Sequence, residues 1–209
     1  MKKKVIVFNG PPGSGKDYAV RAVGATCTKA GLVCAHNKII QPVKEAVHKL
    51  FGMTHGPDRY DVDLYRAEKE QPLEKLFGLS PRQAYIWMSN DVLKPTFGDD
   101  VLGLMAANVM KGQHADVHAF SDGGFLDEWL PITDLVGPAN VLFIEIHATR
   151  DGKALDYNGD SRSYIGDSLV LARPAVTLRK IHNEFGDNND RELFRGMVIG
   201  VANKFLGLD

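Results

Sequence analysis

No apolar run in the sequence approaches the length of about 20 residues that spans a bilayer, so we expect no transmembrane segment. Cysteine is scarce, because Cys27 and Cys34 are the only two in 209 residues. This excludes a disulfide-dense secreted scaffold and favours reduced core cysteines in a cytosolic protein. Neither sign of charge dominates, since 25 basic residues stand against 26 acidic ones. The sequence therefore gives no sign of a nucleic-acid or membrane partner.

Internal repeats and low-complexity segments are also missing from the sequence. The opening MKKKVIVF contains three lysines, yet its apolar stretch is too short for a signal peptide. A chain of this length suits a single α/β domain with a lid. We therefore expect one cytoplasmic domain over residues 1–209.

A glycine-rich loop follows the first apolar run, in the sequence VIVFNGPPGSGKD over residues 5–17. The β-branched start suits a strand buried on both faces of a parallel sheet. The glycines allow successive backbone N–H groups to converge on a phosphate at the N-terminus of the next helix, and Lys16 adds a mobile cation. A plain glycine-rich turn is the alternative. The spacing favours a loop that binds the phosphates of ATP, with contacts at Gly10, Pro11, Gly13, Ser14, Gly15, Lys16, Asp17 and Tyr18.

Asp17 stands where most such loops place Ser or Thr. Its carboxylate can hold Mg²⁺ directly or through a water molecule, because Mg²⁺ prefers oxygen ligands and keeps several waters. The alternative is that it opposes the dipole at the helix N-terminus. The two roles are compatible, and we expect Mg²⁺ as a cofactor.

Apolar strands alternate with amphipathic helices along the rest of the chain, which indicates a parallel sheet covered on both faces. The fold class expected is the three-layer α/β P-loop NTPase fold, with ligands beyond the carboxyl ends of the strands. The core is expected at about residues 1–52, 98–147 and 170–209, a substrate-side helical insertion at about 53–97, and a mobile lid at about 148–168. Strands are predicted at 5–7, 32–40, 117–120, 141–147 and 175–182, and helices at 16–30, 43–51, 81 onwards, 100–111, 125–135 and 191–205.

A phosphate-transferring enzyme also needs a second carboxylate for the metal, cations for the acceptor and a cover that excludes water. Asp122 follows the predicted strand at 117–120, where an acidic metal ligand belongs, or it caps the helix that starts at Phe125. Arg82 lies just after Ser80 and Pro81, which are typical of a helix N-terminus. Its fork can bind a phosphate, or it is a solvated surface arginine.

The glycine-containing segment 148–167 carries three cations, Arg150, Lys153 and Arg162, which suits a flap over a transferring phosphoryl group. Loop arginines are also often only solvated. Two residue spacings resemble metal-binding motifs, but neither fits well. The acidic spacing of 156–167 imitates a calcium loop but lacks its glycine and glutamate, and alternating His114, Asp116 and His118 suit a strand-edge cluster better than zinc.

Several of these segments together resemble the bacteriophage-type deoxynucleoside monophosphate kinases. The loop ending Gly15-Lys16-Asp17 is similar to that of the family, which also carries the unusual aspartate. Where the family has a valine and an arginine, however, this chain has Gly123 and Gly124. The other similar segments are Lys69-Glu70-Gln71-Pro72, Ser80-Pro81-Arg82 with Tyr85, Trp87, Ser89, Asn90 and Asp91, Ser121 to Phe125 with Glu128, the lid-like Arg150 to Arg162, and Asn183 to Leu193.

The resemblance implies that Lys16 and Asp17 bind ATP phosphate and metal, that Arg82 holds the acceptor phosphate, and that Arg150 and Arg162 act from the lid. Metal is expected at Asp17 and Asp122, and substrate at Lys69, Arg82, Trp87, Asn90 and Asp91. Tyr85 and Trp87 are candidates for stacking on a base, although helical aromatics more often belong to the core.

The sequence therefore predicts transfer of the ATP γ-phosphoryl group to a (deoxy)nucleoside monophosphate. The loop also resembles that of animal phosphomevalonate kinase, so another small phosphorylated acceptor, such as phosphomevalonate or dephospho-coenzyme A, stays open. A nucleotide-dependent switch without an acceptor is a third alternative. The base, the sugar and the oligomeric state are undetermined, with a homodimer as one alternative.

Overall fold

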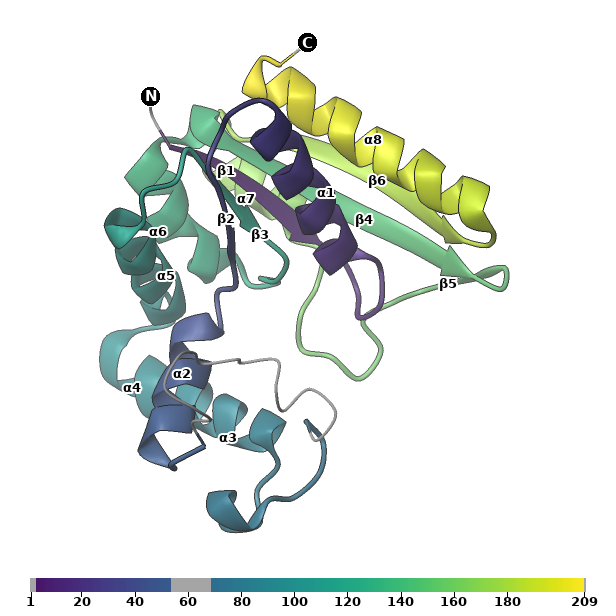
Figure 1. Cartoon of the computed structure of the whole chain (residues 1–209). Helices are drawn as coiled ribbons and strands as arrows, with labels where there is room; N and C mark the ends of the chain where they lie inside the picture. Colours follow the sequence, from purple (N-terminus) through teal and green to yellow (C-terminus); the bar gives the residue numbers. More distant parts are fainter. Residues whose placement is uncertain (1–2, 54–68, 209) are drawn as a thin grey trace.

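Five parallel strands form the central sheet of the computed structural model, which describes residues 3–53 and 69–208 (Figure 1). Within these residues the strands lie side by side in the order β2, β3, β1, β4, β6. The strand that precedes the glycine-rich loop is thus central, with Val5 paired to His118 on one side and Val141 on the other. The strands are β1 (Lys4–Asn9), β2 (Cys34–Asn37), β3 (Val117–Phe120), β4 (Val141–Arg150) and β6 (Thr177–Phe185).

Helices cover both faces of the sheet, with α1 (Lys16–Lys29) and α8 (Asn188–Leu206) on one face (Figure 1). Successive side chains of β1 point to opposite faces. Ile6 and Phe8 pack with α1 and α8, whereas Val5 and Val7 belong to the core on the other face. The expected α/β class with a covered parallel sheet is confirmed. The helices of that other face are α5 (Val101–Gly112), α6 (Leu126–Val136) and α7 (Gly166–Ala172).

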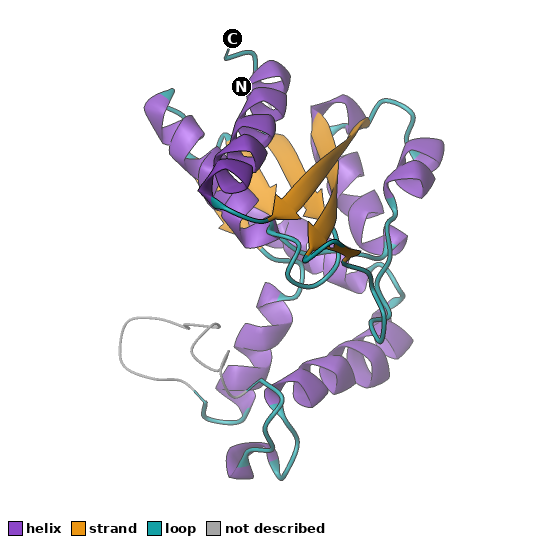
Figure 2. Cartoon of the chain, turned by 90° about the vertical axis from the view of Figure 1, so that its right-hand side faces the viewer, coloured by secondary structure: helices purple, strands orange, loops and turns teal. Residues whose placement is uncertain are grey.

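A second group of helices lies beyond the carboxyl ends of the strands (Figures 1 and 2). The helix α3 starts as expected, because Ser80 caps it in a reciprocal bond with Gln83. A hydrogen bond of 2.6 Å between His48 Nε2 and the Tyr85 hydroxyl joins α2 to α3. Tyr85 is only 7% exposed, so its core alternative is confirmed and stacking on a base is wrong. The group contains α2 (Gln41–Leu50), α3 (Pro81–Trp87), the π-helical stretch Met88–Leu93 and α4 (Lys94–Phe97).

The segment predicted as a loop over 148–167 departs from that prediction at its start. The strand β4 continues to Arg150, turns at Asp151 and Gly152, and pairs with the short antiparallel strand β5 (Lys153–Ala154). Both turn residues have positive φ, of 51° and 70°, which is what a tight hairpin requires. The helix α7 was not predicted, and β6 runs to Phe185 rather than to residue 182.

Two expectations drawn from the composition concern membrane-spanning segments and the cysteines. No helix in the part of the chain that the structure describes is both long and apolar enough to cross a membrane. Cys27, buried in α1, and Cys34, at the start of β2, are free thiols. Residues 54–68, the first part of the insertion expected at about 53–97, lie outside the described residues.

Candidate functional site

The loop between β1 and α1 adopts a conformation that depends on its glycines. Gly13 and Gly15 have φ values of +78° and +99°, in the left-handed region that side chains disfavour. At Gly10 a Cβ atom would fall 2.8 Å from the Ile146 carbonyl oxygen. The chain can therefore pass this close to β4 only without a side chain, and it delivers the loop to the N-terminus of the 14-residue helix α1.

Asn183 fixes the loop from beneath, a role that the sequence did not predict. Its side-chain amide donates a 2.9 Å hydrogen bond to the Ser14 carbonyl oxygen, and the residue is 5% exposed. On the same side, Phe194 of α8 lies against Gly15. The last strand and last helix thus set the loop conformation, although they follow it by more than 160 residues.

Lys16 curls back over the loop and bonds to its backbone. The ammonium group donates to the carbonyl oxygens of Gly10 at 2.6 Å and of Pro11 at 2.7 Å. Burial, reinforced by the charge of Arg162, lowers the pKa of Lys16 to about 8, while Asp17, Asp122 and Asp160 oppose the shift. An anion that binds beside this ammonium group would stabilise its charged form and raise its pKa again. The loop, the end of β3 and the segment 148–168 therefore meet at this ammonium group.

Arg150 lies beside the tip of the loop. One of its terminal nitrogens is 3.9 Å from the position of a Cβ atom on Gly13, and its guanidinium stacks on the Phe185 ring at 4.6 Å. On α8, Arg191 stacks in a similar way on Tyr18, at 4.9 Å. The structure thus brings two of the predicted residues, Arg150 and Tyr18, to the loop and its helix, each against a planar partner.

Arg162 is held by Asp160. Its Nε donates to Asp160 Oδ1 at 2.9 Å, and its Nη2 pairs with Oδ2. This pairing is the main reason that the pKa of Asp160 falls to about 2, with a further contribution from the charge of Arg82. Arg162 also packs against Gly124 and lies within electrostatic reach of Lys16. Arg82 and Arg162, far apart in the sequence, therefore both act electrostatically on the same carboxylate.

Asp122 lies beside the loop, since β3 is the direct neighbour of β1. Its two carboxylate oxygens accept hydrogen bonds from the backbone N–H groups of Ile39, at 2.7 Å, and Ile40, at 3.2 Å. The expected alternative, a cap on the helix after Phe125, is wrong, because Asp122 instead holds the turn that leads into α2. Burial raises the pKa of Asp122, and the two N–H groups partly offset that rise.

The remaining predicted acceptor residues lie on the second group of helices. Arg82, in the first turn of α3, pairs with Glu70 at 3.0 Å, and its backbone N–H bonds to the Lys69 carbonyl oxygen. Trp87, at the end of α3, is 39% exposed, so it does not belong to the core. Asn90 and Asp91 are exposed on the π-helical stretch. π-helical turns are uncommon and often occur at functional sites.

Asn9, the last residue of β1, is a second polar residue that sequence reasoning missed. Its amide lies at hydrogen-bond distance from the Gly123 carbonyl oxygen, the Tyr157 hydroxyl and the Ser163 carbonyl oxygen, at 3.0–3.2 Å. Its own oxygen accepts from the Ile165 N–H at 3.4 Å. Asn9 therefore ties the segment 148–168 and the turn after β3 to the strand that carries the loop.

Metal ligands are sparse at this site. Within the described ranges, no three His, Cys, Asp or Glu side chains come close enough together to hold a metal ion. The carboxylate of Asp160, part of the calcium-like spacing, is occupied by Arg162, and Asp116, part of the zinc-like spacing, accepts from the Val33 N–H. Asp17 and Asp122 can complete a Mg²⁺ shell that is otherwise made of phosphate oxygens and waters.

No protein-family model matches the sequence, and no curated protein matches it. Among solved structures, one similar chain comes from Chloroflexus aurantiacus j-10-fl and is described as a "putative kinase". The two chains are 12% identical with a TM-score of 0.43, over 99% of this chain and 97% of the other. A likeness this distant does not define an activity, so the function is argued from the site residues.

Proposed function

We propose that the protein is an ATP-dependent phosphotransferase whose acceptor is a (deoxy)nucleoside 5′-monophosphate. The observation that carries the proposal is that Lys16 and Arg162 lie within electrostatic reach of one another. The first lies on a glycine-rich loop at a helix N-terminus, and the second lies on a segment that also approaches Arg82. Lys16 thus provides a cation for the phosphates of the donor, and Arg162 and Arg82 provide cations for the phosphate of the acceptor.

On the donor side, the loop N–H groups and the N-terminus of α1 bind the ATP phosphates. Lys16 exchanges its bonds to the Gly10 and Pro11 carbonyl oxygens for phosphate oxygens, which are charged and therefore stronger acceptors. Mg²⁺, when bound, neutralises charge on the phosphate oxygens. Asp17 and Asp122 are the carboxylates that would hold it, and each Asp122 oxygen keeps a free lone pair beside the one backbone hydrogen bond that it accepts.

On the acceptor side, Arg162 and Arg82 bind the phosphate of the monophosphate. Asp160 is paired with Arg162 and feels the charge of Arg82, and the acceptor phosphate replaces or shares its contacts with Arg162. The attacking oxygen is already anionic, so the transfer needs no general base. Positioning and charge neutralisation supply the catalysis.

Arginines on the acceptor side distinguish this proposal from a nucleotide-dependent switch. A switch needs a phosphate-binding loop but no second set of cations for a small anion, whereas here both Arg82 and Arg162 act electrostatically on Asp160. Phosphomevalonate or dephospho-coenzyme A would use the same cations. The acceptor class therefore has to be decided by assay.

The deciding experiment measures ADP release from ATP and Mg²⁺ with each common ribo- and deoxyribonucleoside 5′-monophosphate, and with no acceptor. Our proposal predicts release that depends on one or a few monophosphates, with the diphosphate as the second product. Lys16→Ala should abolish it, while the matched exposed-site variant Lys204→Ala retains it. ATP hydrolysis at an unchanged rate with and without every monophosphate would contradict the proposed acceptor class.

A further inference from the structure

Glu128, in the first turn of α6, is a buried acid without a partner. It is 5% exposed, and within residues 3–53 and 69–208 no group donates a hydrogen bond to its carboxyl oxygens. Its backbone cannot shift, because α5 packs directly on it. A Cβ atom on Gly103 would lie 2.2 Å from the Glu128 carbonyl oxygen. Its carboxyl oxygens are not among the fully enclosed, unpartnered atoms of the described residues, so a ligand that enters the site can still reach them.

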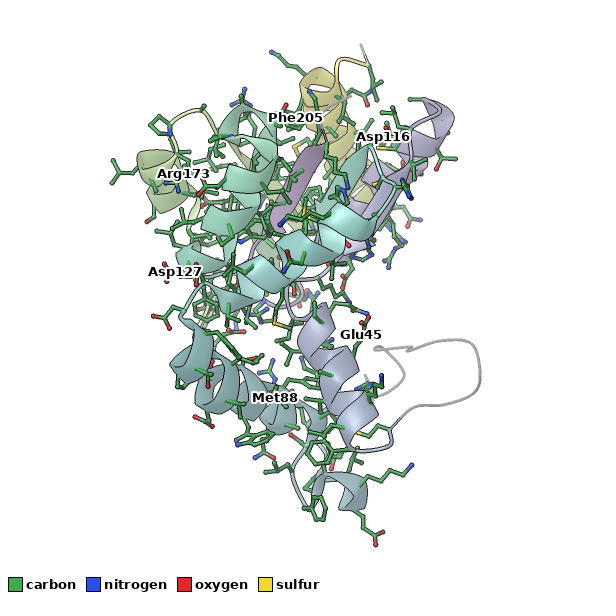
Figure 3. All side chains as sticks on the ribbon, turned by 90° about the vertical axis from the view of Figure 1, so that its left-hand side faces the viewer. Glu45, Met88, Asp116, Asp127, Arg173 and Phe205 are labelled. Atoms are coloured by element: carbon green, nitrogen blue, oxygen red, sulfur yellow. The ribbon has the colours of Figure 1, made fainter. Side chains whose placement is uncertain are left out.

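The groups around Glu128 are those of the acceptor side. Lys94 of α4 reaches over the Phe125 ring, 4.8 Å from its centre, and Arg162 packs against Gly124. Both cations, together with Asp122 and Asp127, act electrostatically on Glu128. Figure 3 shows the neighbouring Asp127 at the end of α6 closest to the second group of helices. The carboxyl group therefore lies within electrostatic reach of Arg162, one of the cations proposed to bind the acceptor phosphate.

We propose that Glu128 is a specificity-determining residue of the acceptor site, where its carboxyl group hydrogen-bonds a sugar hydroxyl group of the nucleotide whose phosphate Arg162 and Arg82 bind. This inference rests on the proposed function, since it assigns a partner group on the same acceptor. The sugar is the part of a nucleoside monophosphate next to the phosphate. A carboxyl group beside the phosphate-binding cations therefore meets the sugar before it meets the base.

The local charges suit a neutral hydroxyl group. Lys94 and Arg162 supply two positive charges near Glu128, and Asp122 and Asp127 supply two negative ones, so the neighbouring charges already balance. Burial, reinforced by Asp122, raises the pKa of Glu128 to about 8. The carboxyl group is therefore largely protonated at neutral pH. A hydroxyl group can donate to a carboxylate and also accept from a carboxylic acid, so it suits either form.

The test compares the 2′-deoxynucleoside 5′-monophosphates with their 2′,3′-dideoxy counterparts as acceptors at saturating ATP. In the unmodified protein, the missing hydroxyl should lower kcat/KM by about tenfold or more, because it leaves a buried carboxyl group unpaired. Glu128→Met, of similar length but without a strong hydrogen-bonding group, should lower kcat/KM for the deoxy substrate to the dideoxy level. Glu128→Gln should keep part of the discrimination, because its amide can still bond a hydroxyl group.

Two controls separate specificity from a general fault. The KM for ATP should stay within about twofold in both variants, and Glu192→Met, on the exposed face of α8, should behave as the unmodified protein. A Glu128→Met variant that keeps the original ratio between the two acceptors, or an unmodified protein that uses both equally, would overturn this inference alone. A protein that phosphorylates no monophosphate would overturn the proposed function and this inference with it.

Discussion

Arg162 fills the space beside Gly124 that any side chain at that position would need. A Cβ atom on Gly124 would lie 2.5 Å from the Cβ and 2.9 Å from the Cγ of Arg162, closer than atoms can pack. The absent side chain thus lets Arg162 approach the end of β3, within electrostatic reach of Lys16. Under the proposed function, a cation of the acceptor side is therefore supplied by the segment 148–168.

Gly124→Ala should therefore displace Arg162. The contact falls on the base of the arginine side chain and not on its flexible end, so the segment itself has to move. We expect kcat/KM for the monophosphate to fall by about tenfold or more while ATP binding changes little. Steady-state kinetics with each substrate varied in turn measures this. Gly196→Ala is the matched control, because a Cβ atom there meets nothing within 4 Å; equal activities of the two variants would refute the role of this contact.

Lys16→Ala should cost several kcal/mol of transition-state stabilisation and leave the fold intact, because the lysine neutralises charge on the migrating phosphoryl group. The depressed pKa adds a pH effect. Lys16 has a pKa of about 8 in the free protein, and bound triphosphate should raise it. Nucleotide binding therefore takes up a proton near pH 8 to 9, and affinity falls as the pH rises further.

Calorimetric titration of ATP in buffers of different ionisation enthalpy measures that proton uptake. Lys16→Arg is the matched control, since arginine stays charged throughout this range and should remove the Lys16-dependent uptake. Near-parental turnover of Lys16→Ala would show that the loop is not catalytic. Identical proton uptake by the unmodified protein and Lys16→Arg would show that another group titrates.

Asp17→Asn and Asp122→Asn should separate a metal role from a structural one. Loss of a carboxylate from the Mg²⁺ shell raises the Mg²⁺ concentration needed for half-maximal activity, and we expect this in both variants. Asp122→Asn should also destabilise the fold by about 1–2 kcal/mol, because an amide cannot accept from both Ile39 and Ile40. Mg²⁺ titrations and thermal unfolding test the two effects. An unchanged Mg²⁺ dependence for Asp17→Asn would reduce that residue to a charge at a helix end.

Much of the fold could be predicted because its signals are local. The run Val5 to Val7 and the periodic apolar face of α1 indicate a strand and a helix on their own. The hairpin at Asp151-Gly152 carried a local turn signal that the prediction did not use. The helix α7 had too few residues to show a period, and its Leu169 is buried only by tertiary packing.

The site was less predictable, because its polar contacts join distant segments. Asn183 bonds to Ser14, and Asp122 bonds to a turn more than 80 residues earlier in the chain. An asparagine or aspartate at a strand end has no local sequence pattern that predicts its hydrogen-bond partner. Glu128 belonged to a resembling segment, but its isolation from donors depends on how α5 and α6 pack. Residue type could therefore be read from the sequence, and partners could not.

Arg82→Ala tests the acceptor side. A guanidinium forms two parallel hydrogen bonds to a phosphate. Its loss should therefore lower the affinity for the monophosphate by about tenfold or more and leave the affinity for ATP nearly unchanged. Arg82→Lys should restore only part of the affinity. Its partner Glu70 provides a control, because the ion pair is more than a third exposed on both sides and contributes little to stability. Paired titrations with ATP and a monophosphate decide the outcome, and equal weakening of both would place Arg82 in the fold or the ATP site.

Glu128 should make the stability of the protein depend on pH in a direction opposite to that of most acids. Its folded-state pKa of about 8 lies above the model-compound value of 4.5, so between these values the folded state binds the extra proton. Stability attributable to Glu128 is then fully present below about pH 4.5 and is lost as the pH rises through about 8. Relative to Glu128→Gln, the unmodified protein should lose on the order of 4–5 kcal/mol across this window.

Urea unfolding of both proteins at intervals from pH 5 to pH 9 measures the difference directly. Asp122 and Asp127 raise this pKa whereas Lys94 and Arg162 lower it, so neutralising a cation with Lys94→Met should widen the gap. Glu192→Gln, with its side chain 66% exposed, should show no such trend. A constant difference between the unmodified protein and Glu128→Gln at every pH would mean that Glu128 ionises normally. The carboxyl group would then be solvated in the free protein, and it would discriminate less strongly between acceptors with and without the sugar hydroxyl group.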